Sequence, residues 1–244
     1  MAGDRNNNSS PEFERYGADA RDRTPEARLD KHRHRARYLI DGARGLYGLQ
    51  PERILDAGCG AGLLLSHVSG DAQLYGFDAN EELAAATGLQ DRADISVRDI
   101  YDTGYPENHF DIAFCSQVLE HLERPERALA ELARVLKPNG VLAASVPCDE
   151  QIKMELCIHC GKTTPRNGHL HSFNEANLDR YLPPELSLQR SMRICLRPVY
   201  NRFHGLPVPI FRMLDRLALA VGGQNAKWLA FFARKTSGSA QGPT

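Results

Sequence analysis

A short strand-like segment followed by three alternating glycines is the feature that most constrains the fold of this chain. Residues 53–56 predict a strand, and Gly58, Gly60 and Gly62 follow in a turn that leads into a helix. Glycine at such a turn lets the backbone bend tightly and approach a ligand closely, where a Cβ atom would block it. Ligands of open α/β sheets bind at the carboxyl ends of strands. The segment therefore predicts a ligand-binding turn.

The segments after this turn alternate between strand and helix patterns. Strands are predicted at 53–56, 73–77, 95–97, 110–116 and 141–146, and helices at 62–68, 81–87 and 125–136. The last of these helices is amphipathic, begins with Pro125 and ends at the turn signal of residues 137–140. Strands separated by helical segments indicate a doubly wound α/β fold with a mostly parallel sheet.

The regions on either side of this alternation have other patterns. Residues 25–47 are rich in arginine with roughly helical apolar spacing, which fits either a solvated capping helix or a lid or surface for an anionic substrate. Residues 148–172 contain cysteines, histidines and turn residues. The C-terminal part then predicts a short helix at 174–181 and one or two strands at 186–197. An amphipathic helix is predicted at 206–232, with a last strand at 228–233.

The overall composition is that of an ordinary globular chain. Of the 244 residues 42% are hydrophobic and 25% are charged, and the net charge is -1. Such a balance gives no general attraction to nucleic acid or to an anionic membrane, although it does not exclude a local patch. The apolar stretch 208–221 is interrupted by Arg212, Asp215 and Arg216, and the N-terminal residues lack the apolar core of a signal peptide. We expect a cytoplasmic protein without a transmembrane segment or a nucleic-acid partner.

Acidic residues stand where three of the predicted strands end. Asp56 precedes the glycine turn, where its carboxylate suits a cationic amino-acid ligand better than a pyrophosphate. Asp78 ends the second strand, where an acid accepts both hydroxyls of a ribose. Asp99 follows the third strand and is placed to accept from an adenine amino group. Leu63 stands where a dinucleotide fingerprint needs a third glycine or alanine, which disfavours a nicotinamide cofactor.

These motifs together resemble the class I methyltransferases, and most closely the subgroup with the ubiquinone-type O-methyltransferases. The resemblance covers about residues 53–146 and is carried by residues 55–62, Asp78, residues 118–122 and residues 132–140. It implies a seven-stranded sheet with its last strand antiparallel and S-adenosylmethionine as the cofactor. It also implies that Asp78 binds the ribose and that the glycine turn cradles the methionine end.

The expected cofactor-binding residues all follow predicted strands. They are Asp56, Gly58, Gly60, Gly62, Asp78, Ala79, Asp99, Ile100 and Ser116. We expect four regions. Residues 1–25 and 235–244 are disordered tails, and residues 26–147 form an S-adenosylmethionine-binding core. Residues 148–234 contain the Cys/His insert, an acceptor lid and the last sheet strands.

The cysteine and histidine residues of the insert have metal-ligand spacing. Cys157 and Cys160 form a CxxC knuckle, and His169 and His171 lie two residues apart, so that both face one side of an extended segment. Three outcomes remain open: a structural zinc site with all four ligands, a three-ligand site with an open position that activates a substrate hydroxyl, and no metal. In the resembling enzymes a Gly-His pair before an aromatic residue occurs without metal, which leaves His169 free to face the substrate.

Methyl transfer needs an aligned acceptor, a dry pocket and, for an oxygen acceptor, a base. His121 and His169 are the candidate bases, because histidine titrates near neutral pH. We expect transfer to a small-molecule acceptor, with O-methylation ahead of N- or C-methylation. The alternative is a methyltransferase-like module that has lost catalysis and binds partners through the zinc knuckle. The sequence does not predict the oligomeric state.

Overall fold

The computed structural model describes residues 25–156, 161–196, 199, 202–203, 205–221 and 226–237, with the side chains of the first helix described from His32 onward. The two predicted tails lie outside this part of the chain, except for residue 25 and residues 235–237.

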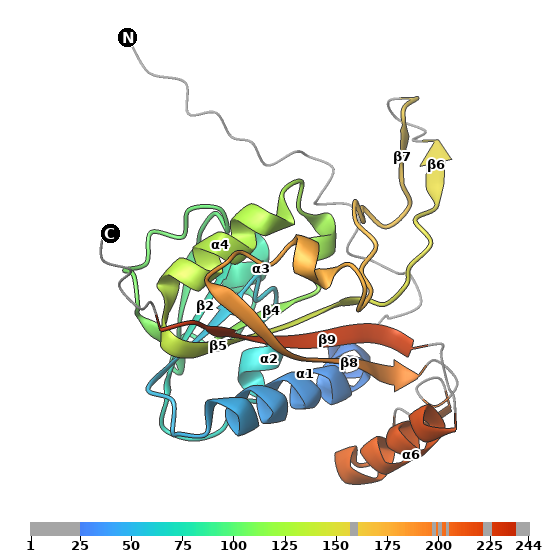
Figure 1. Cartoon of the computed structure of the whole chain (residues 1–244), viewed down its shortest axis with the longest axis horizontal. Helices are drawn as coiled ribbons and strands as arrows, with labels where there is room; N and C mark the ends of the chain where they lie inside the picture. Colours follow the sequence, from blue (N-terminus) through green and yellow to red (C-terminus); the bar gives the residue numbers. More distant parts are fainter. Residues whose placement is uncertain are drawn as a thin grey trace, which may run out of the picture.

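Helices and strands alternate through the first half of the chain (Figure 1). The helices are α1 Pro25–Tyr47, α2 Leu63–Ser66, α3 Glu81–Ala85, α4 Pro125–Val135 and α6 Val208–Ala220, with the 3-10 helices η1 Leu119–His121 and η2 Leu178–Arg180. The strands are β1 Arg53–Ala57, β2 Gln73–Asp78, β3 Ala93–Val97, β4 Phe110–Ser116, β5 Leu136–Pro147, β6 Met154–Leu156, β7 Thr163–Pro165, β8 Leu186–Leu196 and β9 Ala226–Lys235.

Seven strands form one sheet in the order β3-β2-β1-β4-β5-β9-β8. The pairs among β1 to β5 are parallel, and β9 is antiparallel to both β5 and β8. The predicted doubly wound sheet with an antiparallel last strand is therefore confirmed. The chain runs from β1 to one edge and then returns to continue on the other side of β1 at β4, so that the β1–β4 boundary is the switch point where ligands of such sheets bind.

Helices cover both faces of this sheet (Figure 1). On one face α1 and α2 bury Leu39, Ile40 and Leu65 against the sheet, and on the other face α4 buries Leu129 and Leu132. The central strands β4 and β5 are apolar almost throughout because both of their faces are covered. This packing fixes the carboxyl ends of β1, β2 and β4, where the predicted site residues lie.

Three details of the predicted elements differ from the structure. The amphipathic helix expected at 206–232 ends at Ala220, and strand β9 begins at Ala226. The helix expected at 174–181 is reduced to η2. Before it, a local turn is closed by the side chain of Asn174, which accepts from the N–H of Ala176, and by that of Asn177, which accepts from the N–H of Asn174. The turn expected at 137–140 lies within β5. It interrupts the pairing with β4, whose register shifts between Phe110 and Ile112, and Asn139 has a φ of 64°.

The part of the chain after β5 adds a small hairpin and a helix. The hairpin of β6 and β7 stands away from the main sheet, while α6 lies near the end of β8 (Figure 1). Cys157 and Cys160, between β6 and β7, lie outside the described residues. None of the helices in the described part is both long and apolar enough to cross a membrane.

Candidate functional site

The glycine turn after β1 has the backbone conformation that the sequence predicts. Gly58, Gly60 and Gly62 have φ values of 73°, 50° and 74°, in the left-handed region that favours glycine. A Cβ on Gly58 would lie 2.4 Å from Cγ2 of Val118, so this position is closed by packing. A Cβ on Gly60 would meet no described atom within 4 Å. The turn is thus packed at its start and open in its middle, as a cradle for a ligand requires.

Two carboxyl groups lie beside this turn at the ends of β1 and β2. Asp78 is held by backbone donors, since Oδ2 accepts from the N–H of Gly60 at 2.8 Å and Oδ1 from the N–H of Asn80 at 3.0 Å. Asp56 is fully buried, and its burial, followed by the charge of Asp78, raises its pKa to about 7. A buried carboxyl group with a raised pKa at a cleft stabilises a bound cation once it is ionised.

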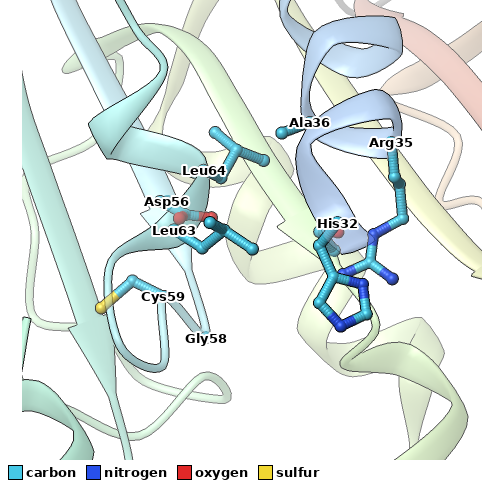
Figure 2. Close-up of a pocket in the computed structure, with 9 residues that line it drawn as sticks. His32, Arg35, Ala36, Asp56, Gly58, Cys59, Leu63 and Leu64 are labelled. Atoms are coloured by element: carbon cyan, nitrogen blue, oxygen red, sulfur yellow. The ribbon is translucent and has the colours of Figure 1, made fainter. Parts of the chain in front are cut away.

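A small cleft that is open to solvent lies between the turn and helix α1. Figure 2 shows His32 and Arg35 of α1 across this cleft from Asp56 and Cys59, and Gly58, Leu63, Leu64, Ala36 and Ser116 complete the lining. The cleft therefore combines a carboxyl group on one wall with basic side chains on the other. A ligand that carries both an ammonium and a carboxylate group suits such a pair of walls.

The end of β4 supplies the remaining predicted wall residue. Ser116 Oγ lies 3.0 Å from Oγ of Ser145 on β5, and the next residue, Gln117, has a φ of 63°. The N–H of Gln117 donates to the carbonyl oxygen of Ser145 at 2.8 Å. This contact turns the chain away from the sheet and leads it into η1.

The other predicted cofactor residues lie outside this cleft. Ala79 and Asp99 are exposed beyond β2 and β3, and Ile100 is buried in the core. Asp99 Oδ1 accepts from the N–H of Tyr101 at 2.8 Å, which fixes its side chain in a local turn. Because β2 and β3 are parallel neighbours, these residues share the edge of the sheet with Asp78. Their assignment to the adenine end stays a prediction.

The segment 168–171 lies along residues 120–122 and brings the two candidate bases together. The N–H of Leu170 donates to the carbonyl oxygen of Glu120 at 2.7 Å, and Nδ1 of His121 lies 3.2 Å from the carbonyl oxygen of Gly168. The ring centroids of His121 and His169 are 4.6 Å apart. Two histidines that are far apart in the sequence therefore form one cluster.

This cluster also contains two carboxyl groups. Nδ1 of His169 contacts Oε2 of Glu150, while Glu120 is fully buried and neither of its carboxyl oxygens has a hydrogen-bond partner among the described residues. Burial raises the pKa of Glu120 to about 7, and burial together with the charge of His169 lowers the pKa of His121 to about 4. For His169 burial acts to lower the pKa, but the hydrogen bond and charge of Glu150 outweigh it and raise the pKa.

The geometry of the cluster allows it to hold a cation. One ligand atom from each of Glu120, His121 and His169 lies within 4.8 Å of the other two. His171 is turned elsewhere, with Nε2 at 2.9 Å from the carbonyl oxygen of Leu122. The predicted ligands Cys157 and Cys160 lie outside the described residues, so the four-ligand zinc site stays a prediction.

Sequence reasoning missed the contribution of His32, Arg35 and Glu150. The first two belong to the basic helix that was interpreted as a cap or a lid, and the excess of arginine and histidine in it was the available signal. Glu150 follows the end of β5, at the same edge of the sheet as the other carboxyl groups. Its partner His169 is 19 residues away, and no local pattern links the two.

A family model, curated relatives and solved structures are similar to this chain. Residues 55–144 match the family model described as a methyltransferase domain. These residues are therefore similar to a methyltransferase domain, in agreement with the predicted enzyme class. The matched range includes the glycine turn, Asp78 and His121.

Two curated relatives illustrate the range of proteins that share this domain. A ubiquinone biosynthesis O-methyltransferase of Photobacterium profundum is 34% identical over 114 residues, which are 43% of this chain and 47% of that protein. The ajmaline N-methyltransferase of Rauvolfia serpentina is 35% identical over 95 residues, which are 35% of this chain and 33% of that protein. The chain thus spans less than half the length of these relatives.

A solved structure supports the fold over a larger part of the chain. The 1,6-didemethyltoxoflavin-N1-methyltransferase of Burkholderia thailandensis, solved with 1,6-didemethyltoxoflavin and S-adenosylhomocysteine, superposes with a TM-score of 0.58. The superposition covers 83% of this chain and 78% of that chain at 19% identity. At this identity the likeness concerns the fold alone.

Proposed function

We propose that this chain transfers the methyl group of S-adenosylmethionine to a small-molecule acceptor, with an oxygen atom as the first candidate for the methylated atom. The observation that carries the proposal is the cleft at the sheet's switch point, where buried Asp56 and the open glycine turn face Arg35. S-adenosylmethionine has a sulfonium, an ammonium and a carboxylate group at one end. In this proposal Asp56 stabilises the cationic groups, and Arg35 and His32 attract the carboxylate.

The other cofactor contacts follow the order of the strands. Asp78 accepts the ribose hydroxyls with the lone pairs that its two backbone donors leave free. Gly58, Gly60 and Gly62 let the backbone approach the methionine end, and Ser116 lines the same cleft. The adenine end then falls to residues after β2 and β3, which are Ala79, Asp99 and Ile100.

The acceptor side of the proposal rests on the cluster of His121 and His169. His121 is neutral at physiological pH because its pKa is lowered, and a neutral imidazole accepts a proton from an acceptor hydroxyl. Named relatives methylate oxygen in one case and nitrogen in the other, which supports a small-molecule acceptor without fixing the atom. The near-zero net charge gives no general attraction to nucleic acid, so the proposal includes no nucleic-acid partner. It also places the protein in the cytoplasm.

A metal ion at the acceptor side is part of the proposal, with two alternative ligand sets that share His169. The first is the predicted zinc site of Cys157, Cys160, His169 and His171. The second is the group of Glu120, His121 and His169, which is supported by the buried, unpartnered carboxyl group of Glu120. Histidine nitrogen and carboxylate oxygen both bind zinc and other divalent transition metals.

Cofactor binding is the decisive experiment for the function. Titration calorimetry with S-adenosylmethionine should give binding in the wild-type protein and at least about a tenfold weaker affinity in Asp78→Ala, which loses two charged hydrogen bonds. An unchanged affinity would refute the ribose assignment, and failure of the wild type to bind would refute the proposal. Binding without methyl transfer to any of a panel of phenols, catechols and amines would favour the alternative, a non-catalytic module.

Metal analysis distinguishes the two ligand sets. Elemental analysis of the purified protein should find a divalent metal in the wild type. Loss of this metal in Cys157→Ser/Cys160→Ser but not in Glu120→Gln would assign it to the zinc knuckle, and the reverse would assign it to the Glu120 cluster. A wild-type protein without bound metal, after reconstitution with zinc, would refute both ligand sets and leave His121 and His169 as bases.

A further inference from the structure

Helix α6 is attached to the body of the protein through its polar side. Asp215 is fully buried, and its Oδ2 accepts from the Tyr38 hydroxyl at 2.9 Å and from the N–H of Cys195 at 2.9 Å. Arg212 pairs with Asp41 of α1 at 2.7 Å. These contacts tie α6 to α1 on one side and to β8 on the other.

Aromatic stacking completes this attachment. Phe211 of α6 is buried, and its ring stacks on His34 of α1 with centroids 3.8 Å apart. Just before α6, the carbonyl oxygen of Leu206 accepts from Arg33 of α1 at 2.8 Å. These contacts fix which side of α6 faces the body of the protein, and therefore which of its residues face outward.

The outward side of α6 is apolar. Ile210, Met213 and Leu217, with Val221 just after the helix, are 45%, 54%, 57% and 86% exposed. Their spacing of three and four residues puts all four on one stripe, opposite Phe211 and Asp215. A helix on the surface of a globular domain usually turns its apolar stripe toward the core. Here apolar side chains lie on both sides of the helix, and the large ones of the outward stripe remain in contact with water.

The charges around this stripe have one sign. Between residues 197 and 221 the sequence contains a single acidic residue, and that residue is the buried Asp215. Arg202 and Arg216 are exposed, and Phe203 adds another exposed apolar side chain before the helix. The exposed surface of this segment is therefore apolar and basic, without a carboxylate.

We propose that α6 and the segment before it form a docking surface for an anionic lipid bilayer. An interfacial helix buries its apolar stripe at the boundary of headgroups and acyl chains, while neighbouring arginines contact anionic headgroups. The 13 residues of α6 give a length of about 20 Å, which suits a helix lying in the interface and not one crossing it.

The charge pattern favours a bilayer over a second copy of the chain. A two-fold contact between two α6 helices would place the same patch on both sides, so that Arg216 and Arg202 of each copy would approach like charges. An anionic bilayer instead offers opposite charge over the whole patch. On such a bilayer both the apolar and the basic side chains of the patch contribute to binding.

Vesicle co-sedimentation of the full chain tests this proposal. We expect the wild type to bind vesicles of phosphatidylcholine with phosphatidylglycerol more strongly than vesicles of phosphatidylcholine alone. Changing Ile210, Met213 and Leu217 together to serine should weaken binding by about 100-fold, since each loses an apolar side chain from the interface. Arg202→Gln/Arg216→Gln should weaken it by about tenfold, and only with anionic vesicles.

A matched control changes exposed leucines elsewhere on the molecule. Leu49→Ser/Leu83→Ser removes exposed apolar side chains away from α6 and should leave vesicle binding unchanged. S-adenosylmethionine affinity and circular dichroism report whether each variant is folded, because no residue of α6 lines the described cleft. Equal sedimentation of the triple variant and the wild type would overturn the proposal. So would a wild type that ignores vesicles and forms a dimer that the triple variant loses, because the stripe would then be a contact between copies.

Discussion

The two halves of the molecule hold their buried polar groups in different ways. In residues 53–147 the groups at the strand ends are fixed by backbone donors close by, as Asp78 is fixed by the N–H groups of Gly60 and Asn80. In residues 148–237 side chains from distant parts of the sequence take part as well, and Asp215 combines such a partner with the backbone N–H of Cys195. His169 contacts Glu150, and Asp215 accepts from Tyr38, which is 177 residues away.

This difference separates two tasks. A cradle made of backbone keeps one shape for one ligand, which suits a cofactor that stays the same while acceptors vary. A network of side chains changes with single substitutions, which suits the recognition of a particular acceptor or surface. Substitutions in the first half should therefore act through backbone conformation, and those in the second half through the partners they leave unpaired.

The largest effect is expected at Gly58. Gly58→Ala adds a Cβ 2.4 Å from Val118 at a φ of 73°, so that strain and overpacking add. We expect the free energy of unfolding to fall by roughly 2–5 kcal/mol, as measured by urea denaturation. Gly60→Ala is the matched control, because its Cβ meets no described atom within 4 Å, and it should cost only about 1 kcal/mol.

The pair also separates folding from binding. Gly60→Ala should weaken S-adenosylmethionine binding more than its small cost in stability suggests, because the added methyl group projects into the cradle. Equal stabilities of the two variants would contradict the claim that packing against Val118 closes the first position of the turn.

A slightly smaller effect is expected in the second half at Asp215. Asp215→Ala leaves the Tyr38 hydroxyl and the Cys195 N–H without their acceptor in a buried place, which should lower the free energy of unfolding by about 2–3 kcal/mol. Asp41→Asn removes only the exposed partner of Arg212 and should cost less than about 1 kcal/mol. If both variants lost the same stability, α6 would not be anchored through Asp215.

The same contrast explains what could be predicted from the sequence. The strand–turn–helix pattern of residues 53–68 is local, because its apolar run and its glycines are set by neighbouring residues. The order of strands and helices up to β5 was therefore predicted almost completely, and the antiparallel last strand followed from the family resemblance. Asp56, Gly58 and Ser116 line one cleft, and their role in binding the cofactor stays a prediction.

The rest depends on contacts between distant residues. No spacing rule indicates that Arg35 of α1 faces the cleft, or that Glu150 meets His169. Most of the helix predicted at 174–181 is instead a turn closed by asparagine side chains, an outcome set by the detailed loop conformation. The outward position of the apolar stripe of α6 likewise depends on the buried carboxyl group of Asp215, which the sequence pattern shows only as an interruption of an apolar run.

The pH dependence of cofactor binding tests the role of Asp56 in the first half of the molecule. Because the pKa of Asp56 is raised to about 7, its carboxyl group is largely protonated below this value and ionised above it. Only the ionised form attracts the cationic end of S-adenosylmethionine, so the affinity should rise by roughly tenfold between about pH 6 and pH 8. Calorimetry of Asp56→Asn should find this rise absent.

His32 lines the same cleft, so His32→Gln is the control for this experiment. The rise in affinity with pH should persist in this variant if Asp56 is responsible. A rise that persists in Asp56→Asn would contradict the assignment of the pH dependence to Asp56.

The smallest effect is expected for the exposed ion pairs of the second half. Arg193 pairs with Asp149 at 2.8 Å and with Glu175 at 2.9 Å, which links β8 to the segments before and after the small hairpin. Because both acidic partners are exposed, Arg193→Gln should lower the free energy of unfolding by only about 0.2–1 kcal/mol, and high salt should remove the difference. Urea denaturation at low and high salt measures both values. A loss as large as that of Asp215→Ala would mean that exposed ion pairs stabilise this half as strongly as buried hydrogen bonds do. Buried groups alone would then not distinguish the side-chain network of the second half from the backbone-fixed cradle of the first.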